Sequence, residues 1–340
     1  MLENTTMQTS GRKLCLLLVF GIAALSASAQ SFDCGKAATP FDKFICANRD
    51  LSAADSKMAA AYKAALAQLS EEGRRRLVES QRSWLKYERN TSNLDVRYLK
   101  GTYSSRMKEL EKTLETVGPF KIQSLTMYKA EIMDQAAQKQ KTPPDEGDSD
   151  TAGSLKFSFP RIESPSTAET ERSNRLVEED IRKFAGELKS GTGVEVDFEI
   201  TYASQDVISL DLGMWSFSRK WAHPNHAGAG YIVLLRSGRE LQASDLFTPT
   251  KSWKTFLNGI VFRKLKAQAA KEDWILSPSS AAKLDADAVK RWTITKQGLK
   301  IRFVHYEVSS YASGPHEVVV SWAELKPYLK ATLPFSVPQP

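Results

Sequence analysis

The chain has 340 residues, 41% of them hydrophobic and 26% charged, with a formal net charge of +7. This composition is that of ordinary globular protein, and the length is sufficient for two domains with separate cores. The positive charge favours anionic partners, but the basic residues are dispersed apart from Arg74-Arg75-Arg76. Together with the export signal described next, this dispersal argues against nucleic acid as a partner.

Residues 1–29 have the pattern of a secretory signal peptide. Arg12 and Lys13 precede the apolar run Leu14 to Leu25, and Ala27-Ser28-Ala29 predicts cleavage before Gln30. The apolar run would form a helix of about 18 Å, which is too short for a bilayer core of about 30 Å. Since no other segment approaches the length of a membrane span, we expect a mature chain without one, located in the periplasm or outside the cell.

Two cysteines remain after this cleavage, because Cys15 lies in the removed segment. Cys34 and Cys46 therefore have one possible pairing, and an exported protein works in an oxidising compartment. Redox-active cysteines are usually closer together, as in Cys-X-X-Cys. We expect a structural disulfide that stabilises a small helical domain.

Residues 30–117 have helical periodicity and no strand pattern, which predicts a small helical bundle. Four helices are expected. The first covers Pro40 to Ala47, and the second begins at Ser52, with Asp55 completing a capping box. Ser70 caps the third, and the fourth runs from about Leu94 to Leu114.

An ordered set of residues in this half forms a recognisable pattern. The set is Cys34, Thr39-Pro40, Lys43, Ile45-Cys46, Leu51, Asp55, Ala61-Tyr62, Gln81-Arg82-Ser83-Trp84-Leu85 and Arg89. It resembles the N-terminal domain of the lysozyme inhibitor LprI of mycobacteria, a small secreted helical domain. One difference is that Asn90-Thr91-Ser92-Asn93 stands where many relatives carry a further cysteine, so a second disulfide is not expected.

Residues 118–154 are expected to connect the two halves. Phe120 to Met133 is ambiguous, because its first part alternates like a strand while Tyr128 to Ala137 could be helical. Lys139 to Ser154 contains two prolines, glycines and a cluster of acidic residues without an apolar period. These features are typical of an exposed linker.

Residues 155–335 mix the two periodicities. Strict alternation from Val194 to Tyr202 predicts a strand with one buried face, and Ala168 to Leu188 has the pattern of an amphipathic helix. The predicted class is α+β, with a mainly antiparallel sheet and packed helices behind the disulfide-linked helical bundle. The proline in Lys156–Ile162 is expected to end that strand. The other expected strands are Val207–Phe217, Tyr231–Leu235, Trp292–Thr295, Leu299–Val304 and Val318–Val320. The other expected helices are Trp253–Ala269 and Trp322–Leu329.

Short segments in this half also form an ordered series. The segments are Phe159-Pro160-Arg161-Ile162, Ala222-His223-Pro224-Asn225, Gly238-Arg239-Glu240-Leu241, Asp245-Leu246-Phe247, Gly298-Leu299-Lys300-Ile301, Tyr306, Tyr311-Ala312-Ser313-Gly314-Pro315 and Trp322-Ala323-Glu324-Leu325-Lys326. In order and spacing they are similar to the extracellular domain of the lysozyme-sensing anti-sigma factor RsiV and to the accessory domain of some peptidoglycan deacetylases. Lys220-Trp221 departs from the glycine that often precedes the Ala-His pair in these domains.

Sequence motifs of catalysis are absent from the chain. It has no Gly-X-Ser-X-Gly elbow, phosphate-binding loop or His-Glu-X-X-His, although a glycosidase-like carboxylate pair is left open by the many acidic residues. His223 and His226 are three apart, but Pro224 between them prevents the helical context of a metal-binding pair. We therefore expect no cofactor, no metal and no enzymatic activity, and the simplest interpretation of this segment is a turn with exposed imidazoles.

Both resemblances imply binding to lysozyme and not a reaction. They predict an exported envelope protein that binds lysozyme or a related muramidase. Inhibition would follow because the bound protein occupies the substrate cleft of the enzyme. The candidate contact residues are His223, His226, Tyr306 and Tyr311, because tyrosine provides contact area at small entropic cost. Two alternatives remain open: a binder of anionic peptidoglycan or lipopolysaccharide, and a cell-wall hydrolase or deacetylase accessory protein.

Overall fold

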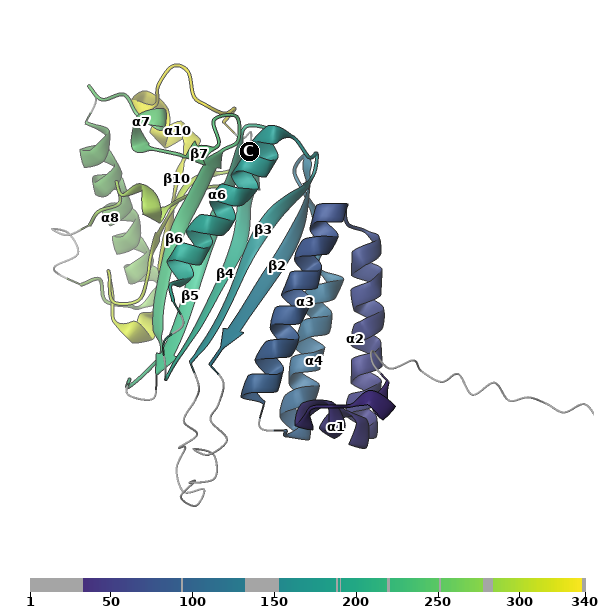
Figure 1. The fold of residues 1–340 in the computed structure, drawn as a ribbon. Helices are drawn as coiled ribbons and strands as arrows, with labels where there is room; N and C mark the ends of the chain where they lie inside the picture. The colour runs from purple at the N-terminus through teal and green to yellow at the C-terminus, as the bar shows by residue number, and fades with distance from the viewer. Residues whose placement is uncertain are drawn as a thin grey trace, which may run out of the picture.

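The computed structural model describes residues 33–92, 94–131, 153–187, 189, 191–218, 221–250, 252–277 and 284–337. The predicted signal peptide and nearly all of the predicted acidic linker lie outside these residues. Figure 1 shows three parts side by side: a helical module, a large sheet with one long helix across it, and a small sheet with its own helices. Among the described residues, none of the helices combines the length and apolar character needed to cross a bilayer.

The helical module begins with the short 3₁₀ turn η1 (Cys34–Lys36), which the Cys34–Cys46 disulfide ties to the first helix. Trp84, Leu99 and Tyr103 are the centre of its core, and the ring of Trp84 meets that of Tyr103 edge-on at 5.4 Å. The predicted disulfide and helical fold are confirmed. The helices are α1 (Pro40–Ala47), α2 (Arg49–Ala67), α3 (Glu71–Thr91) and α4 (Val96–Glu111).

Helix starts follow side-chain caps, though not always the predicted ones. Ser70 caps α3 as expected, by accepting a hydrogen bond from the backbone N–H of Gly73. The predicted cap Ser52 is wrong, because Asn48 accepts from Asp50 and Leu51 and starts α2 one turn earlier. The predicted fourth helix, from about Leu94 to Leu114, is too long, since α4 ends at Glu111. The prediction of a region to Val117 without strands is also wrong, since Leu114–Val117 is a strand.

The large sheet has seven strands in sequence order, β1-β2-β3-β4-β5-β6-β7. All pairs are antiparallel except β3 with β4, which α6 (Ala168–Ala185) connects. The ambiguous segment after Gly118 is strand β2, and β3 continues through Pro160. The strands are β1 (Leu114–Val117), β2 (Phe120–Ala130), β3 (Ser154–Ser164), β4 (Thr192–Ala203), β5 (Val207–Ser218), β6 (Asn225–Leu234) and β7 (Arg239–Glu240).

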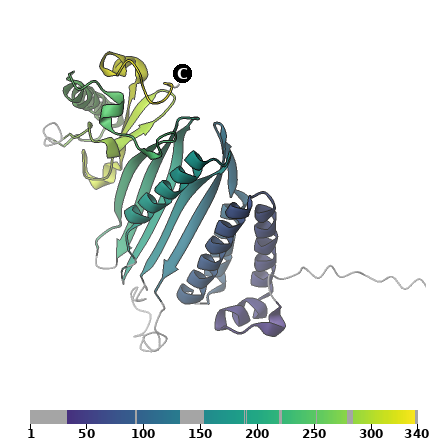
Figure 2. The same ribbon diagram turned by 45° about the horizontal axis from the view of Figure 1, so that its top comes forward.

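The two faces of this sheet have different covers. On one face, Phe157, Val196 and Leu210 pack against Val177 and Ile181 of α6, as Figures 1 and 2 show for the helix and strands. Because side chains alternate along a strand, the intervening residues of β3, β4 and β5 point to the opposite face. That opposite face is covered by the helical module at β2 and by the small sheet at β5 and β6.

The small sheet has the order β10-β9-β8, and its core includes Trp292 and Leu257. Gly230 lets it approach β6, because a Cβ there would overlap the backbone carbonyl of Trp292. Buried Asp211 of β5 also joins the two sheets, accepting from Lys300 at 2.8 Å and Arg302 at 2.7 Å. The elements of this part are α7 (Ala243–Leu246), α8 (Trp253–Glu272), η2 (Val289–Arg291), β8 (Trp292–Ile294), β9 (Gly298–Phe303), η3 (Tyr311–Ser313), β10 (His316–Ser321), α10 (Trp322–Leu325) and η4 (Lys326–Tyr328).

Helix α3 attaches the helical module to the large sheet through polar contacts. The Ser80 hydroxyl donates to the carbonyl of Thr126 at 2.6 Å, and Arg76 pairs with Glu178 of α6 at 2.5 Å. The backbone N–H of Ser70 donates to the buried carboxylate of Glu163 on β3. The N-terminus of α3, with its partial positive charge, therefore lies on an anionic group of the sheet.

Candidate functional site

Five rings of histidine and tyrosine meet where two connections lie next to each other. His223 lies in the connection between β5 and β6, and His226 is on β6 itself. His305, Tyr306 and Tyr311 belong to the connection between β9 and β10. The connections become neighbours because the small sheet packs over the glycines of β6. We call these five residues the histidine–tyrosine cluster.

The cluster is stacked and hydrogen-bonded. Ring centroids are 4.3 Å apart for His223 and Tyr311, 4.4 Å for His226 and His305, and 4.7 Å for His305 and Tyr311. His223 Nδ1 lies 2.9 Å from the carbonyl of Pro224, so this nitrogen carries the proton and donates. The other nitrogen of His223 then accepts from the Tyr306 hydroxyl at 3.0 Å.

Tyr311 lies at the centre of this network. Its hydroxyl donates to the Pro224 carbonyl at 3.2 Å and lies 3.2 Å from His226 Nε2, from which it can accept. Nδ1 of His305 is buried without a hydrogen-bond partner in the described part of the chain. Burial lowers the pKa of His305, and the neighbouring His226 and Arg302 lower it further. Both effects favour the neutral form of His305.

Tyr306 projects from the cluster and is 61% exposed. Its φ of 69° is in the left-handed region, where a tyrosine is strained. The turn that holds it is fixed by Glu307, which accepts from the backbone N–H of Val304 and pairs with Arg291 at 2.7 Å. The structure thus maintains an unfavourable backbone conformation that points an aromatic ring outward.

Exposed tryptophans extend this surface. Trp215 is 40% exposed and is the cross-strand partner of His226, while Trp221 is 38% exposed. Trp215 also stacks on Phe217 at 6.1 Å. Apolar rings at the edge of the cluster therefore form a patch that is larger than the cluster alone.

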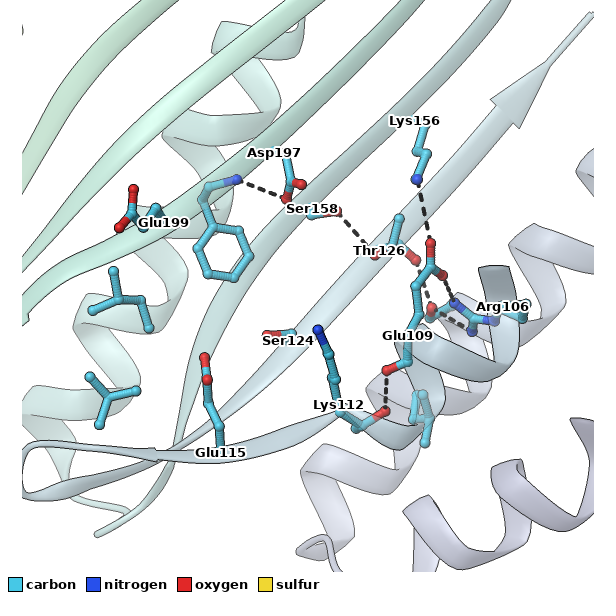
Figure 3. Close-up of a pocket in the computed structure, with 16 residues that line it drawn as sticks. Arg106, Glu109, Lys112, Glu115, Ser124, Thr126, Lys156, Ser158, Asp197 and Glu199 are labelled. Carbon is cyan, nitrogen blue, oxygen red and sulfur yellow. Dashed lines mark hydrogen bonds and ion pairs between the residues drawn. The ribbon is translucent and has the colours of Figure 1, made fainter. Parts of the chain in front are cut away.

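A polar groove lies on the same face of the sheet, between α4 and β4, with a volume of about 400 Å³ (Figure 3). Asp197 and Glu199 project from β4 toward this groove and are exposed, while Lys112 and Glu115 approach from the other side. Lys156 connects the two walls, with its Nζ 3.4 Å from Glu109 of α4 and 2.8 Å from Glu195 of β4.

The groove and the cluster are continuous across the sheet. The register places Lys156 beside Glu195, Glu195 beside Trp215, and Trp215 beside His226. One row thus runs from the charged groove to the histidine–tyrosine cluster. The lining of the groove also holds Arg106, Lys112 and Lys156, so its charge is nearly balanced. The exposed carboxylates of Asp197 and Glu199 are the part of this surface that suits contact with positively charged groups of a macromolecule.

The four residues predicted as contacts, His223, His226, Tyr306 and Tyr311, lie together in the structure. Their role in binding stays a prediction. The interpretation of His223 to His226 as an exposed turn is wrong, since His226 belongs to β6 and both imidazoles are partly buried. In the part of the chain that the structure describes, no three His, Cys, Asp or Glu side chains form a group able to hold a metal.

Sequence reasoning missed His305 and Trp215. His305 directly precedes the predicted contact Tyr306 in the sequence, so its neighbourhood to the site could have been inferred. Trp215 could be assigned to the site only once the register of β5 against β6 is known. The carboxylates of β4 were visible as the polar half of an alternating strand, but the sequence does not say that their face is left partly open.

Comparison with known families identifies two domains. Residues 34–141 match the model of the lysozyme inhibitor LprI family, and residues 244–323 match a family described as protein of unknown function (DUF3298). The chain thus has an LprI lysozyme-inhibitor domain followed by a DUF3298 domain. The first resemblance found in the sequence is confirmed, whereas the more specific similarity to the anti-sigma factor stays a prediction.

Two solved structures of the DUF3298 family are similar to this chain. The protein from Bacteroides fragilis is 12% identical, with a TM-score of 0.41 over 64% of this chain and 96% of that one. The protein from Pseudomonas aeruginosa is 15% identical, with a TM-score of 0.39 over 63% and 95%. No curated protein matches the chain.

Proposed function

We propose that this chain is an exported cell-envelope protein that binds and inhibits lysozyme or a related muramidase without catalysing a reaction. The observation that carries the proposal is the LprI match, which spans helices α1–α4 and strands β1 and β2. The Cys34–Cys46 disulfide supports export, because such bonds persist in oxidising compartments.

The histidine–tyrosine cluster is the proposed contact surface. Its rings are already stacked and bonded in the free protein, so little side-chain entropy is lost when a partner covers them. Tyr306 protrudes on a fixed turn and would enter the enzyme's cleft. Inhibition would then result from exclusion of the glycan substrate.

The net positive charge of the chain restricts how a basic lysozyme can approach it. The chain carries +7, and repulsion would slow its encounter with a basic lysozyme. Asp197 and Glu199 provide a local surface of the opposite sign, close to the cluster. We therefore expect the partner to approach across β4, with its basic residues over the groove.

A lysis assay tests the proposal. Purified residues 30–340 added to a turbidity assay should slow lysis by lysozyme, and Tyr306→Ala should weaken this effect at least tenfold. Val319→Ala, an exposed apolar residue on β10, is the matched control and should inhibit like the unaltered protein.

The chain's positive charge supports the second candidate, a binder of anionic cell-wall polymer. Unchanged lysis together with salt-sensitive retention on peptidoglycan sacculi would replace the inhibitor by this candidate. Lysis by the purified protein alone would instead make it a hydrolase.

A further inference from the structure

A second cavity, of about 610 Å³, opens on the LprI domain between α3 and α4. It shares Arg106, Glu109 and Lys156 with the polar groove, and none of its lining residues belongs to the histidine–tyrosine cluster. Three tyrosines, Tyr87, Tyr98 and Tyr128, form much of its wall, and Tyr98 is 40% exposed. The other lining residues are Trp84, Glu88, Asp95, Arg97, Gly101, Thr102, Ser105, Arg106, Glu109 and Lys156.

Glu88 is the unusual member of this lining. It is only 2% exposed, and its Oε2 has no hydrogen-bond partner among the described residues. Burial raises the pKa of this carboxyl to about 7, and a hydrogen bond with Thr102 opposes the rise. An ionised carboxylate that is buried without a neighbouring cation is unfavourable, and the raised pKa of Glu88 reflects this. A cation placed beside Glu88 would offset that cost.

Two of the three cations in the lining, Arg106 and Lys156, are engaged by other groups, and the third, Arg97, is exposed. Arg106 donates to Gln81 at 2.9 Å and pairs with Glu109 at 2.9 Å. Lys156 pairs with Glu109 and with Glu195. Neither is paired with Glu88.

Gly101 gives a second, independent indication. It lies inside α4, where glycine costs about 0.5–1 kcal/mol relative to alanine. A Cβ at this position would meet no described atom within 4 Å. Packing of the chain itself therefore does not require the glycine, which lies at an exposed position of the cavity lining.

We propose that the cavity receives a lysine or arginine side chain of the muramidase, with the cation against the tyrosine rings and paired with Glu88. The inference rests on the proposed function. Aromatic rings attract ammonium and guanidinium groups through their faces, and a buried carboxylate provides the counter-charge. Arginine anchors that fill such pockets often dominate the energetics of an interface.

The same pairing predicts a pH dependence. A bound cation favours the ionised form of Glu88, so below about pH 7 binding must release a proton and affinity falls by up to about tenfold per pH unit. The rings that interact electrostatically with Glu88 are Tyr87, Tyr98 and Tyr103, and burial raises the pKa of each, which keeps them neutral. The charged groups facing it in the cavity are Asp95, Arg97, Arg106, Glu109 and Lys156.

The test uses residues 30–340, with butylguanidinium and butylammonium as probes and butanol as the neutral control. Amide shifts of Gly101 and Thr102 are followed by NMR at pH 6 and pH 8. Saturable shifts with the cations, stronger at pH 8 and absent with butanol, are expected. Glu88→Gln and Gly101→Leu should each weaken them at least tenfold, and should weaken lysozyme inhibition by a similar factor.

The outcomes separate the two proposals. Probe binding that depends on Glu88, in a protein that inhibits no lysozyme, would leave the cavity assignment standing and overturn the proposed function. Full inhibition by both variants would overturn the cavity assignment, as would probe shifts unchanged by either substitution. Gly101→Leu keeps the test decisive if Glu88→Gln does not fold, because leucine favours the helix and extends into open space.

Discussion

Two glycines in neighbouring helices should respond oppositely to the same substitution. Gly73 is in the first turn of α3, and a Cβ there would lie 2.5 Å from Oε1 of Glu163. That carboxylate is buried, pairs with Arg161 and accepts from the backbone N–H of Ser70. Gly73→Ala must therefore displace the anion that joins α3 to the sheet.

The magnitude follows from the lost contacts. A hydrogen bond to a charged group contributes about 1.5–3 kcal/mol, and the higher helix propensity of alanine returns at most about 1 kcal/mol. Gly73→Ala should thus lower the free energy of unfolding by about 1–2 kcal/mol. Gly101→Ala adds its methyl group to open space and should raise it by about 0.5–1 kcal/mol.

Urea unfolding of residues 30–340, followed by circular dichroism, measures both changes. The slope of the transition should stay the same, so that the midpoints compare stability directly. Equal shifts for the two variants, or a Gly73→Ala protein as stable as the unaltered one, would refute the assigned role of Glu163.

Two further predictions concern pH and the disulfide. Burial lowers the pKa of His305 and of His316 below 6.5 in the folded state, so their contribution to stability is present above pH 6.5 and is lost as the pH falls. Glu88, with its pKa raised to about 7, acts in the opposite direction over this range, so the comparison between two proteins isolates the histidine. From pH 7 to pH 5 the urea midpoint of His305→Gln should increase relative to that of the unaltered protein, and equal slopes for both proteins would contradict this. Replacing Cys34 and Cys46, 12 residues apart, by serine should lower the free energy of unfolding by about 3 kcal/mol, and an unchanged midpoint would show that the bridge contributes little.

Local sequence signals predicted those elements whose periodicity matches their burial. Strand β4 was evident from alternation, and α6 begins at the predicted Ala168. Ser52 failed as a helix start because Asp55, its expected capping partner, is buried instead, and accepts a hydrogen bond from Tyr103. A capping pattern is informative only where the chain is free to begin a helix.

Long-range pairing decided the remaining elements. Strand β1 has four residues without clear alternation and is defined by its pairing with β2. Pro160 is tolerated inside β3 because pairing with β4 ends at Phe157, so that in the described part of the chain no strand needs an N–H from Pro160 on that side. The division of the chain at residues 117 and 154 stays a prediction, although β1 and β2 pack with both halves.

The candidate site was predictable in residue type but not in arrangement. Tyr306 and Tyr311 were selected because tyrosine suits interfaces, and His223 and His226 were named together with them. Their stacking depends on the small sheet lying across Gly230, a contact between residues far apart in the sequence. The buried Glu88 had no sequence signal, because its helical position alone does not distinguish a core carboxyl from a solvated one.

Competition with a substrate analogue tests the central claim most directly. Binding of lysozyme to residues 30–340 would be titrated by calorimetry with increasing chitotriose, which occupies the enzyme's cleft. If the histidine–tyrosine cluster blocks that cleft, the apparent Kd should rise in proportion to the chitotriose concentration. Absence of binding, or a Kd that does not change with chitotriose, would contradict the account.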